Sequence, residues 1–261
     1  MSKFAIDSHC GRVRELNEDS YAAAPDIGLW LVADGVGGHE SGEVASELTR
    51  STIVARYRQT GDLVRAIEAA HRAVRSAIAN NEGGANMAST VVALALQGRN
   101  FQIAWVGDSR AYLWDGALRL LTRDHSLVEE LVKSGEISRA EGDKHPSRNV
   151  ITRCVGMASN APIQVSSLSG SLAHGESLLL CSDGLNDAVD AETISHTLSS
   201  VVSAERRVAE LIAAALRGGG RDNVTVAVID SGASGITERQ LTAPASSKLN
   251  TAWQRLRNLF Q

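Results

Sequence analysis

Residues 29–35 read Leu-Trp-Leu-Val-Ala-Asp-Gly, an apolar run of strand length that passes directly into an aspartate and a glycine. Three further apolar runs lie against an aspartate in the same way, at residues 103–108, 178–184 and 222–229. Asp-Gly is a common hairpin turn, so any single case could mark only the end of a strand. Four cases, together with the acidic segment at residues 17–19, favour a functional explanation for the set.

Aspartates at the ends of buried strands are held on rigid supports, and several of them together need a positive partner. Like charges that share a low-dielectric site repel one another and raise one another's pKa. A hard divalent cation removes that cost because it binds carboxylate oxygens. The sequence therefore predicts a metal centre that includes Asp34, Asp108, Asp183 and Asp222.

Arg14 and several glycines accompany these acidic residues. The Arg14 side chain could have either of two roles: it could form an ordinary salt bridge, or it could bind two oxygens of a phosphate in a bidentate manner. Glycines at positions 35, 37 and 38 let the backbone approach a metal or an anion closely, and the carbonyl of Gly35 is a candidate ligand. A strand pair could bring Glu18 and Asp19 beside Asp34.

Length and composition exclude several classes of protein. The 261 residues suffice for one large core, and the net charge of −4 argues against nucleic acid as the main partner. Three cysteines without CxxC spacing predict neither a disulfide framework nor a zinc site, which fits a reducing cytoplasm. The N-terminus lacks an apolar signal region, and no apolar stretch approaches the roughly 18 residues of a membrane span. We expect a soluble, cytoplasmic monomer.

The order of the elements predicts an α+β fold. Helical spacing of apolar residues predicts one helix over about 43–57 and a second after the N-cap Asp62, with Val44, Leu48, Ile53 and Val54 as the core stripe of the first. Short links predict antiparallel strands, and a further helix is expected near the end. These segments are expected at residues 4–10, 27–33, 89–97, 100–107, 110–114, 118–121, 163–168, 176–182 and 224–229 for strands and 204–216 for the helix. Strands grouped with strands and helices with helices indicate a layered α+β domain.

Two changes in composition divide the chain. Residues 126–149 are polar and charged, which predicts an inserted flap or loop. From residue 231 a linker rich in small residues leads to a basic amphipathic helix, with apolar positions Leu249, Trp253, Leu256 and Phe260. That helix packs on its own domain, frays, or docks on a partner or a membrane surface. We expect residues 1–230 to form the catalytic domain and 231–261 to form the tail.

Five groups of residues resemble, in order, the motifs of the metal-dependent Ser/Thr protein phosphatases, the PPM or type 2C family, in their bacterial form. The groups are residues 11–19, 32–39, 107–110, 182–185 and 220–225. The resemblance runs from about residue 4 to 230. It implies a four-layer α-β-β-α sandwich of two antiparallel sheets flanked by helices, and hydrolysis of phosphoserine and phosphothreonine on proteins.

The resemblance also implies roles for individual residues. Asp34 would bridge two Mn²⁺ or Mg²⁺ ions, with Asp183 and Asp222 on the first and the Gly35 carbonyl on the second. A metal-activated water would attack the phosphorus. The supporting roles fall to Glu18 and Asp19 through bound waters, Asp108 at a third, weaker metal, Asn223 beside Asp222, Arg14 on the phosphate, and His39, whose role as proton donor, ligand contact or helix cap stays open. Val36 stands where eukaryotic relatives carry a histidine after the Asp-Gly. The resemblance further implies that the flap at residues 126–149 lies beside the site, where a flexible loop can select substrates.

Alternative functions of the same fold are kept beside this one. The chain could be a catalytically silent phosphoprotein-binding module, although no metal carboxylate is missing. The basic tail could add a scaffold role, and a metal-dependent nuclease is disfavoured by the acidic net charge. Expected partners are phosphorylated proteins that a bacterial Ser/Thr kinase modifies. His125, His145 and His174 are expected at the surface or in turns, because hard divalent metals prefer oxygen.

Overall fold

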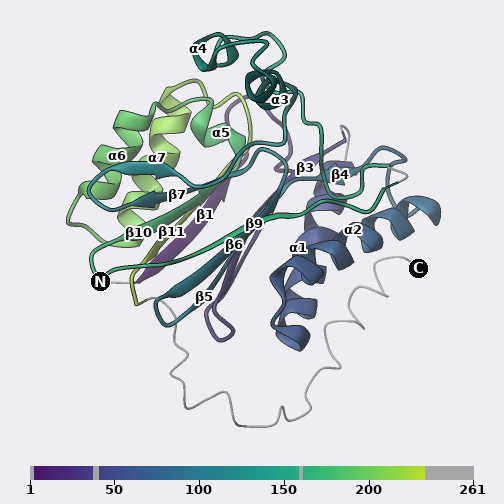
Figure 1. Cartoon of the computed structure of the whole chain (residues 1–261), viewed down its shortest axis with the longest axis horizontal. Coiled ribbons are helices and arrows are strands. Elements are labelled where there is room, and N and C mark those ends of the chain that lie inside the picture. The colour runs from purple at the N-terminus through teal and green to yellow at the C-terminus, as the bar shows by residue number, and fades with distance from the viewer. Residues whose placement is uncertain (1–2, 38–40, 159–160, 233–261) are drawn as a thin grey trace.

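Two antiparallel sheets face each other in the computed structural model, which describes residues 3–37, 41–158 and 161–232 (Figure 1). The first sheet has the strand order β1-β11-β10-β7-β8, and the second has β2-β3-β5-β6-β9 with β4 against β3. The strands are β1 Phe4–His9, β2 Asp19–Ala24, β3 Leu29–Val36, β4 Ala88–Ser89, β5 Val91–Gln97, β6 Asn100–Val106, β7 Arg110–Trp114, β8 Leu118–Leu120, β9 Ser166–Ser171, β10 Ser177–Cys181 and β11 Val224–Asp230. Strands therefore occur wherever the sequence predicts them, and β9 starts three residues later than expected.

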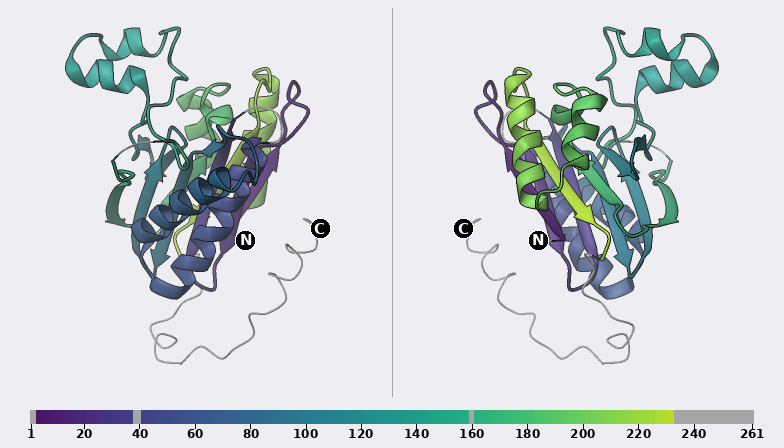
Figure 2. Two further views of the ribbon diagram at one scale, coloured as in Figure 1. Left: turned by 90° about the vertical axis from the view of Figure 1, so that its right-hand side faces the viewer. Right: turned by 90° about the vertical axis from the view of Figure 1, so that its left-hand side faces the viewer.

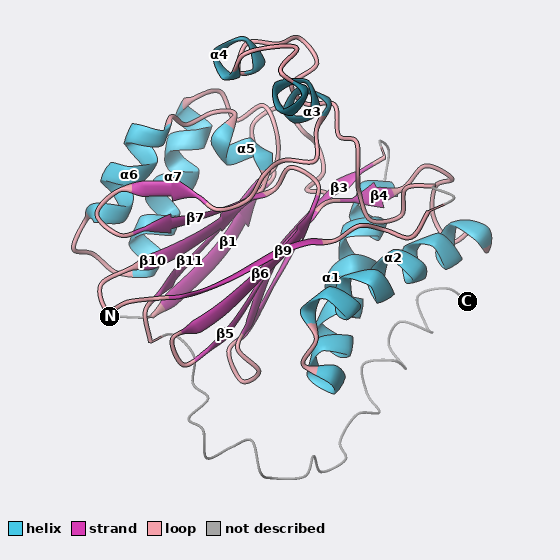
Figure 3. Ribbon diagram, viewed as in Figure 1, coloured by secondary structure: helices cyan, strands magenta, loops and turns pink. Residues whose placement is uncertain are grey.

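Helices cover the outer face of each sheet (Figure 3). The helices are α1 Ser41–Thr60, α2 Leu63–Ala79, α3 Leu127–Ser134, α4 Arg139–Gly142, α5 Asp183–Asn186, α6 Ala191–Ser199 and α7 Ala204–Arg217. The pair α1 and α2 lies on the second sheet, and α6 and α7 lie on the first. Helices α3 and α4 project from one end of the sandwich (Figure 2). The four-layer arrangement that the resemblance implies is confirmed.

Three apolar clusters hold the four layers together. Trp30 and Leu180 lie in the cluster between the sheets, whereas Leu31 lies under α1 and α2 and Leu179 lies under α6 and α7. Successive side chains of a strand point to opposite faces, so each of these strands contributes to two clusters. This is why strands β3 and β10 read as continuous apolar runs, as expected for sheets that are covered on both faces.

The first helix differs from its predicted packing. Val44 is exposed, while the helix buries a row of small residues together with Ile53 and Tyr57. The small row is Gly42, Ala45, Ser46 and Thr49. Small side chains allow the helix to approach strands β2 and β3 closely, so apolarity alone misplaced the buried face. The predicted tail helix at 249–260 lies outside the described residues.

The part of the chain that the structure describes contains no helix of the length and apolarity that a membrane span requires. None of the three cysteines, Cys10, Cys154 and Cys181, is paired in a disulfide. The absence of a disulfide framework therefore agrees with the prediction from cysteine spacing.

Asp62 caps α2 as predicted: its side chain accepts a hydrogen bond of 3.0 Å from the backbone N–H of Arg65. We expect Asp62→Ala to lower the free energy of unfolding by about 1 kcal/mol, because an N–H group at the start of the helix loses its partner. Asp62→Asn keeps the acceptor and serves as the control. Urea denaturation of the three proteins measures the difference, and equal losses in both variants would contradict the assignment.

Candidate functional site

Asp19 and Asp34 lie directly opposite each other on neighbouring strands. Strand β2 pairs with β3 in an antiparallel register that sets Asp19 against Asp34. The backbone N–H of Gly35 also donates to the carbonyl of Glu18 at 3.1 Å. The predicted strand pair is therefore present, and it places two carboxylates where cross-strand like charges destabilise each other.

Asp19 also connects the two sheets. Its Oδ2 accepts hydrogen bonds from the hydroxyls of Ser182, at 2.8 Å, and Thr225, at 2.6 Å. Ser182 follows β10 and Thr225 lies on β11, both in the opposite sheet. Ser182 Oγ accepts in turn from the backbone N–H of Thr225 at 2.9 Å. A buried, charge-assisted crosslink thus fixes the ends of the two sheets at the point where the acidic residues gather.

Asp183 and Asp222 come from the first sheet. Asp183 is the first residue of α5, separated from the end of β10 by Ser182, and Asp222 precedes β11. Asp222 Oδ2 accepts a hydrogen bond from the guanidinium of Arg14 at 2.8 Å. In this structure Arg14 thus forms the ordinary salt bridge, the first of its two predicted roles. The guanidinium is about half exposed, with 52% of its side chain accessible, so its outer edge is open to a ligand.

Asn223 fastens the loop that carries Arg14. Its amide nitrogen donates to the carbonyls of Cys10 and Leu16, at 3.0 and 2.9 Å. Its Oδ1 accepts from the backbone N–H of Glu18 at 2.8 Å. Three hydrogen bonds of one buried side chain therefore hold both ends of the loop in place.

Burial and mutual repulsion raise the pKa values of this acidic group. The pKa of Asp34 is raised well above its ordinary value, first by burial and then by Asp19 and Asp183. Burial likewise raises the pKa of Asp183, with Asp108 and Asp222 adding repulsion. Burial raises the pKa of Asp19 to about 6, although the hydroxyls of Thr225 and Ser182 oppose the shift. These carboxylates therefore lie close enough to interact strongly, as the sequence predicts.

Three buried carboxylate oxygens lack a hydrogen-bond partner among the described residues: Glu18 Oε1, Asp19 Oδ1 and Asp108 Oδ1. Such oxygens are costly to bury unless a cation or a proton satisfies them. A Cβ on Gly35 would come within 2.2 Å of the Gly42 carbonyl oxygen, so only glycine fits there. The donor set of carboxylates and a main-chain carbonyl suits Mg²⁺ or Mn²⁺.

The side chains are not arranged as a closed ligand shell. Within the described ranges, no three His, Cys, Asp or Glu side chains form a ready metal-binding group. Two contacts account for part of this: Asp222 is paired with Arg14, and Asp19 Oδ2 is occupied by two hydroxyls. The residues thus fit a metal by their chemistry and position.

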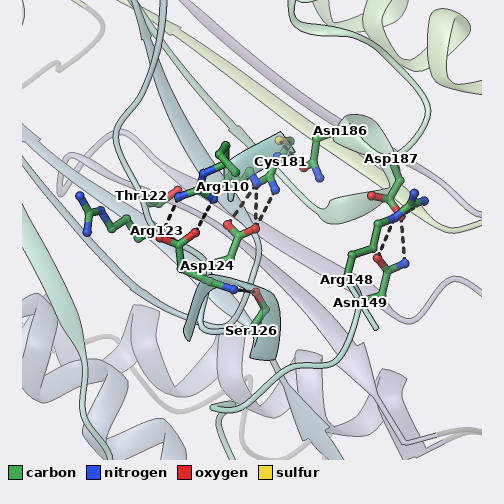
Figure 4. A network of polar contacts seen from close by, with 12 residues as sticks. Arg110, Thr122, Arg123, Asp124, Ser126, Arg148, Asn149, Cys181, Asn186 and Asp187 are labelled. Atoms are coloured by element: carbon green, nitrogen blue, oxygen red, sulfur yellow. Dashed lines mark hydrogen bonds and ion pairs between the residues drawn. The ribbon is translucent and has the colours of Figure 1, made fainter. Parts of the chain in front are cut away.

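Asp108 borders a cavity of about 250 Å³ beneath the flap. Burial raises the pKa of Asp108 to about 6, and Asp124 adds to the shift. Asp183 lines the same cavity, whereas Asp34 does not. Figure 4 shows the guanidinium of Arg110 donating several hydrogen bonds to the carboxylate of Asp124. The shortest of these is 2.7 Å. The cavity therefore extends from the acidic group to the flap.

The flap is tied to the acidic group through Asp187, four residues after Asp183. Asn149 donates to Asp187 Oδ2 at 3.0 Å, and Arg148 lies 3.5 Å from the same oxygen (Figure 4). Asp187 and Asp124 were not predicted as site residues. Their only sequence signal is proximity to Asp183 and to the flap, because the contacts join segments far apart in the chain.

Two histidine predictions have different outcomes. His39 lies outside the described residues. His125, expected at the surface or in a turn, is buried, so the surface alternative is wrong for this residue: Nδ1 accepts from the backbone N–H of Gly107 at 3.1 Å, and Nε2 lies 2.9 Å from Ser166 Oγ. Burial, with help from Arg153, lowers the pKa of His125 to about 4. A neutral ring in this position supports the turn that carries Asp108.

Comparison with known proteins shows that this chain is similar to serine/threonine protein phosphatases. The sequence profile described as protein phosphatase 2C matches residues 7–217. The serine/threonine protein phosphatase PstP of Mycobacterium tuberculosis is 40% identical over 241 residues, which covers 87% of this chain and 45% of that protein. The chain thus spans less than half the length of this relative.

Two further relatives are covered almost completely. The serine/threonine phosphatase stp of Listeria welshimeri is 34% identical over 235 residues, covering 84% of this chain and 92% of that protein. The crystal structure of the catalytic domain of PstP in complex with two manganese ions superposes with a TM-score of 0.75 at 35% identity, covering 87% and 96% of the two chains. Both similarities extend over more than four fifths of this chain.

The raised pKa of Asp34 predicts a pH-dependent stability effect in metal-free protein. A carboxyl whose folded-state pKa is raised stabilises the fold at low pH, and this contribution is lost as the pH rises through that pKa. We expect Asp34→Asn, in EDTA at pH 7.5, to raise the free energy of unfolding by about 0.5–2 kcal/mol, and to do less at pH 5. Thermal unfolding at both pH values measures this, with the exposed Asp26→Asn as control. Destabilisation by Asp34→Asn at pH 7.5 would contradict the electrostatic account.

Proposed function

Because this chain belongs to the protein phosphatase 2C family, we propose that it hydrolyses phosphoserine and phosphothreonine esters of proteins. The observation that carries the proposal is the acidic group itself. Carboxylates from both sheets are gathered at one end of the sandwich, and three of their buried oxygens lack a partner within the described residues. An arrangement of this kind is costly without cations, so a purely structural role does not explain it.

Asp34, Asp183, Asp222 and the carbonyl of Gly35 are the residues that we propose hold two divalent ions, Mn²⁺ or Mg²⁺. Two such ions, when bound, lower the pKa of a shared water and so supply the nucleophile. Asp108 stands apart from Asp34 on the cavity wall and suits a third, weaker ion. Glu18 and Asp19 each have an oxygen without a partner in the described ranges, which is available for a bound water.

Arg14 is proposed to bind the phosphate of the substrate. It lies at the exposed side of Asp222, and its guanidinium can turn toward a phosphate while the loop stays fixed by Asn223. A guanidinium binds two phosphate oxygens in one plane, which orients the phosphorus toward the attacking water. The salt bridge and the phosphate contact thus describe two states of one side chain.

The flap and the tail are assigned by the same reasoning. Residues 126–149 border the cavity next to Asp183, so we propose that they help to select the protein substrate. We propose residues 1–230 as the catalytic unit, because β11 completes the first sheet at Asp230. The substrates that we infer are proteins phosphorylated by a Ser/Thr kinase. Three unpaired thiols support a reducing, cytoplasmic location. We propose a monomer as the simplest state of the chain.

Hydrolysis of p-nitrophenyl phosphate and of a phosphothreonine peptide tests the proposed function. We expect both substrates to be turned over with Mn²⁺, and EDTA to abolish turnover. Asp183→Asn should lower kcat by about 100-fold or more, because it removes an anionic metal ligand. The exposed helix cap Asp190→Asn is the control. Metal binding without turnover would replace the proposal with a silent phosphoprotein-binding module.

Arg14→Lys tests the phosphate grip, because lysine keeps the charge and loses the planar fork. We expect kcat/KM for both substrates to fall by about tenfold or more, as measured for lost hydrogen bonds to charged groups. Arg12→Lys, in the same loop, is the matched control. Unchanged kcat/KM in Arg14→Lys would leave Arg14 as a salt-bridge residue only.

A further inference from the structure

A second cavity, of about 340 Å³, adjoins the one beside the acidic group. Asp124 and Glu129 line both cavities and so form the wall between them. The second cavity lies where α3 of the flap meets the end of β6 and the start of β9. Its remaining walls include Trp105, Arg123, Lys133, Arg153 and Ser166, and we call it the basic hollow.

The charges around the basic hollow are unbalanced. Asp124 is bound by Arg110, and Glu129 is bound by Arg139. Arg123, Lys133 and Arg153 have no side-chain hydrogen bond or ion pair in the described part of the chain, and both Arg123 and Lys133 are exposed. Glu130 alone opposes these three cations from the lining. The hollow therefore carries an excess of positive charge next to an acidic reaction centre.

The floor of the hollow provides a neutral donor as well. The ring of His125 stacks on Trp105 with centroids 6.2 Å apart and planes inclined by 15°. Because His125 Nδ1 accepts from Gly107, the neutral ring carries its proton on Nε2 and donates it to Ser166 Oγ. The hydroxyl hydrogen of Ser166 is then available for an acceptor in the hollow. A fixed aromatic floor, a hydroxyl donor and three cations suit a compact anionic group.

We propose that the basic hollow binds an acidic side chain of the phosphoprotein substrate, a carboxylate or a second phosphate, a few residues from the phosphorylated residue that is cleaved. This inference rests on the proposed function. An extended peptide advances roughly 3.3 Å per residue. A substrate peptide whose phosphate lies at Asp183 therefore needs only a short segment to pass Asp124 and Glu129 and reach the basic hollow. The hollow thereby selects phosphorylation sites with acidic neighbours, although the centre itself repels acids.

Phosphothreonine peptides with a single glutamate, moved one position at a time away from the phosphothreonine on either side, test the proposal. For wild type we expect kcat/KM to be roughly 3- to 10-fold higher for one or two positions of glutamate than for the matched glutamine peptides. In Arg123→Ala/Arg153→Ala this ratio should fall to about 1. The control Arg65→Ala/Arg206→Ala removes the same charge from distant, exposed sites and should keep the wild-type ratio. A ratio near 1 in wild type at every position overturns the proposal.

Calorimetric titration separates this proposal from the proposed function. The probes are the acidic peptide with threonine in place of phosphothreonine, and inorganic phosphate alone. Binding of the acidic peptide to wild type and not to Arg123→Ala/Arg153→Ala supports the hollow even if no turnover is found. Phosphate bound there as tightly as the peptide overturns the proposal in favour of a small-anion site. If Arg153→Ala unfolds, Arg123→Ala/Lys133→Ala applies the same test with two exposed residues.

Discussion

The crosslink from Asp19 to Ser182 and Thr225 is the interaction on which the acidic centre depends. It joins β2 of one sheet to β10 and β11 of the other, at the end where the predicted metal ligands gather. The same carboxylate faces Asp34 across the strand pair. A charged group that is buried between two sheets destabilises the fold unless it is fully hydrogen-bonded, and one of its oxygens remains unpartnered within the described structure. The side chain of Asp19 therefore both links the two sheets and offers an oxygen to a cation or its bound water.

The acidic group around Asp19 is held rigidly by the strands, whereas the neighbouring flap is attached more loosely. The apolar clusters fix the strands, and Asp34 within β3, Asp108 just after β6 and Asp183 at the start of α5 are held close to them. By contrast, the flap is attached by polar contacts at the surface, such as those of Arg148 and Asn149 with Asp187. Exposed ion pairs of this kind contribute little to stability, so the flap can adapt to different substrates while the centre keeps its geometry.

Most acidic residues of the site could be predicted from the sequence, but the contacts that join them to the flap and to the second sheet could not. The acidic residues could be found because each follows or precedes an apolar strand, and the pairing of Asp19 with Asp34 follows from two strands joined by a short turn. Asp187, Asp124 and the cavity that they line had no comparable signal. Likewise the burial of His125 was not predictable, because its two partners, Gly107 and Ser166, are far from it in the chain.

The sequence by itself determined the class of fold, the cap at Asp62 and the identity of the acidic residues, because these follow from local periodicity, capping chemistry and strand-end position. Only the tertiary structure decided which carboxylates interact, since contacts between the two sheets depend on how the layers are stacked. It also decided that Val44 faces solvent, that Asp222 is paired with Arg14, and that three cations without a partner among the described residues border one hollow. Such features arise from packing between distant segments, which no local pattern records.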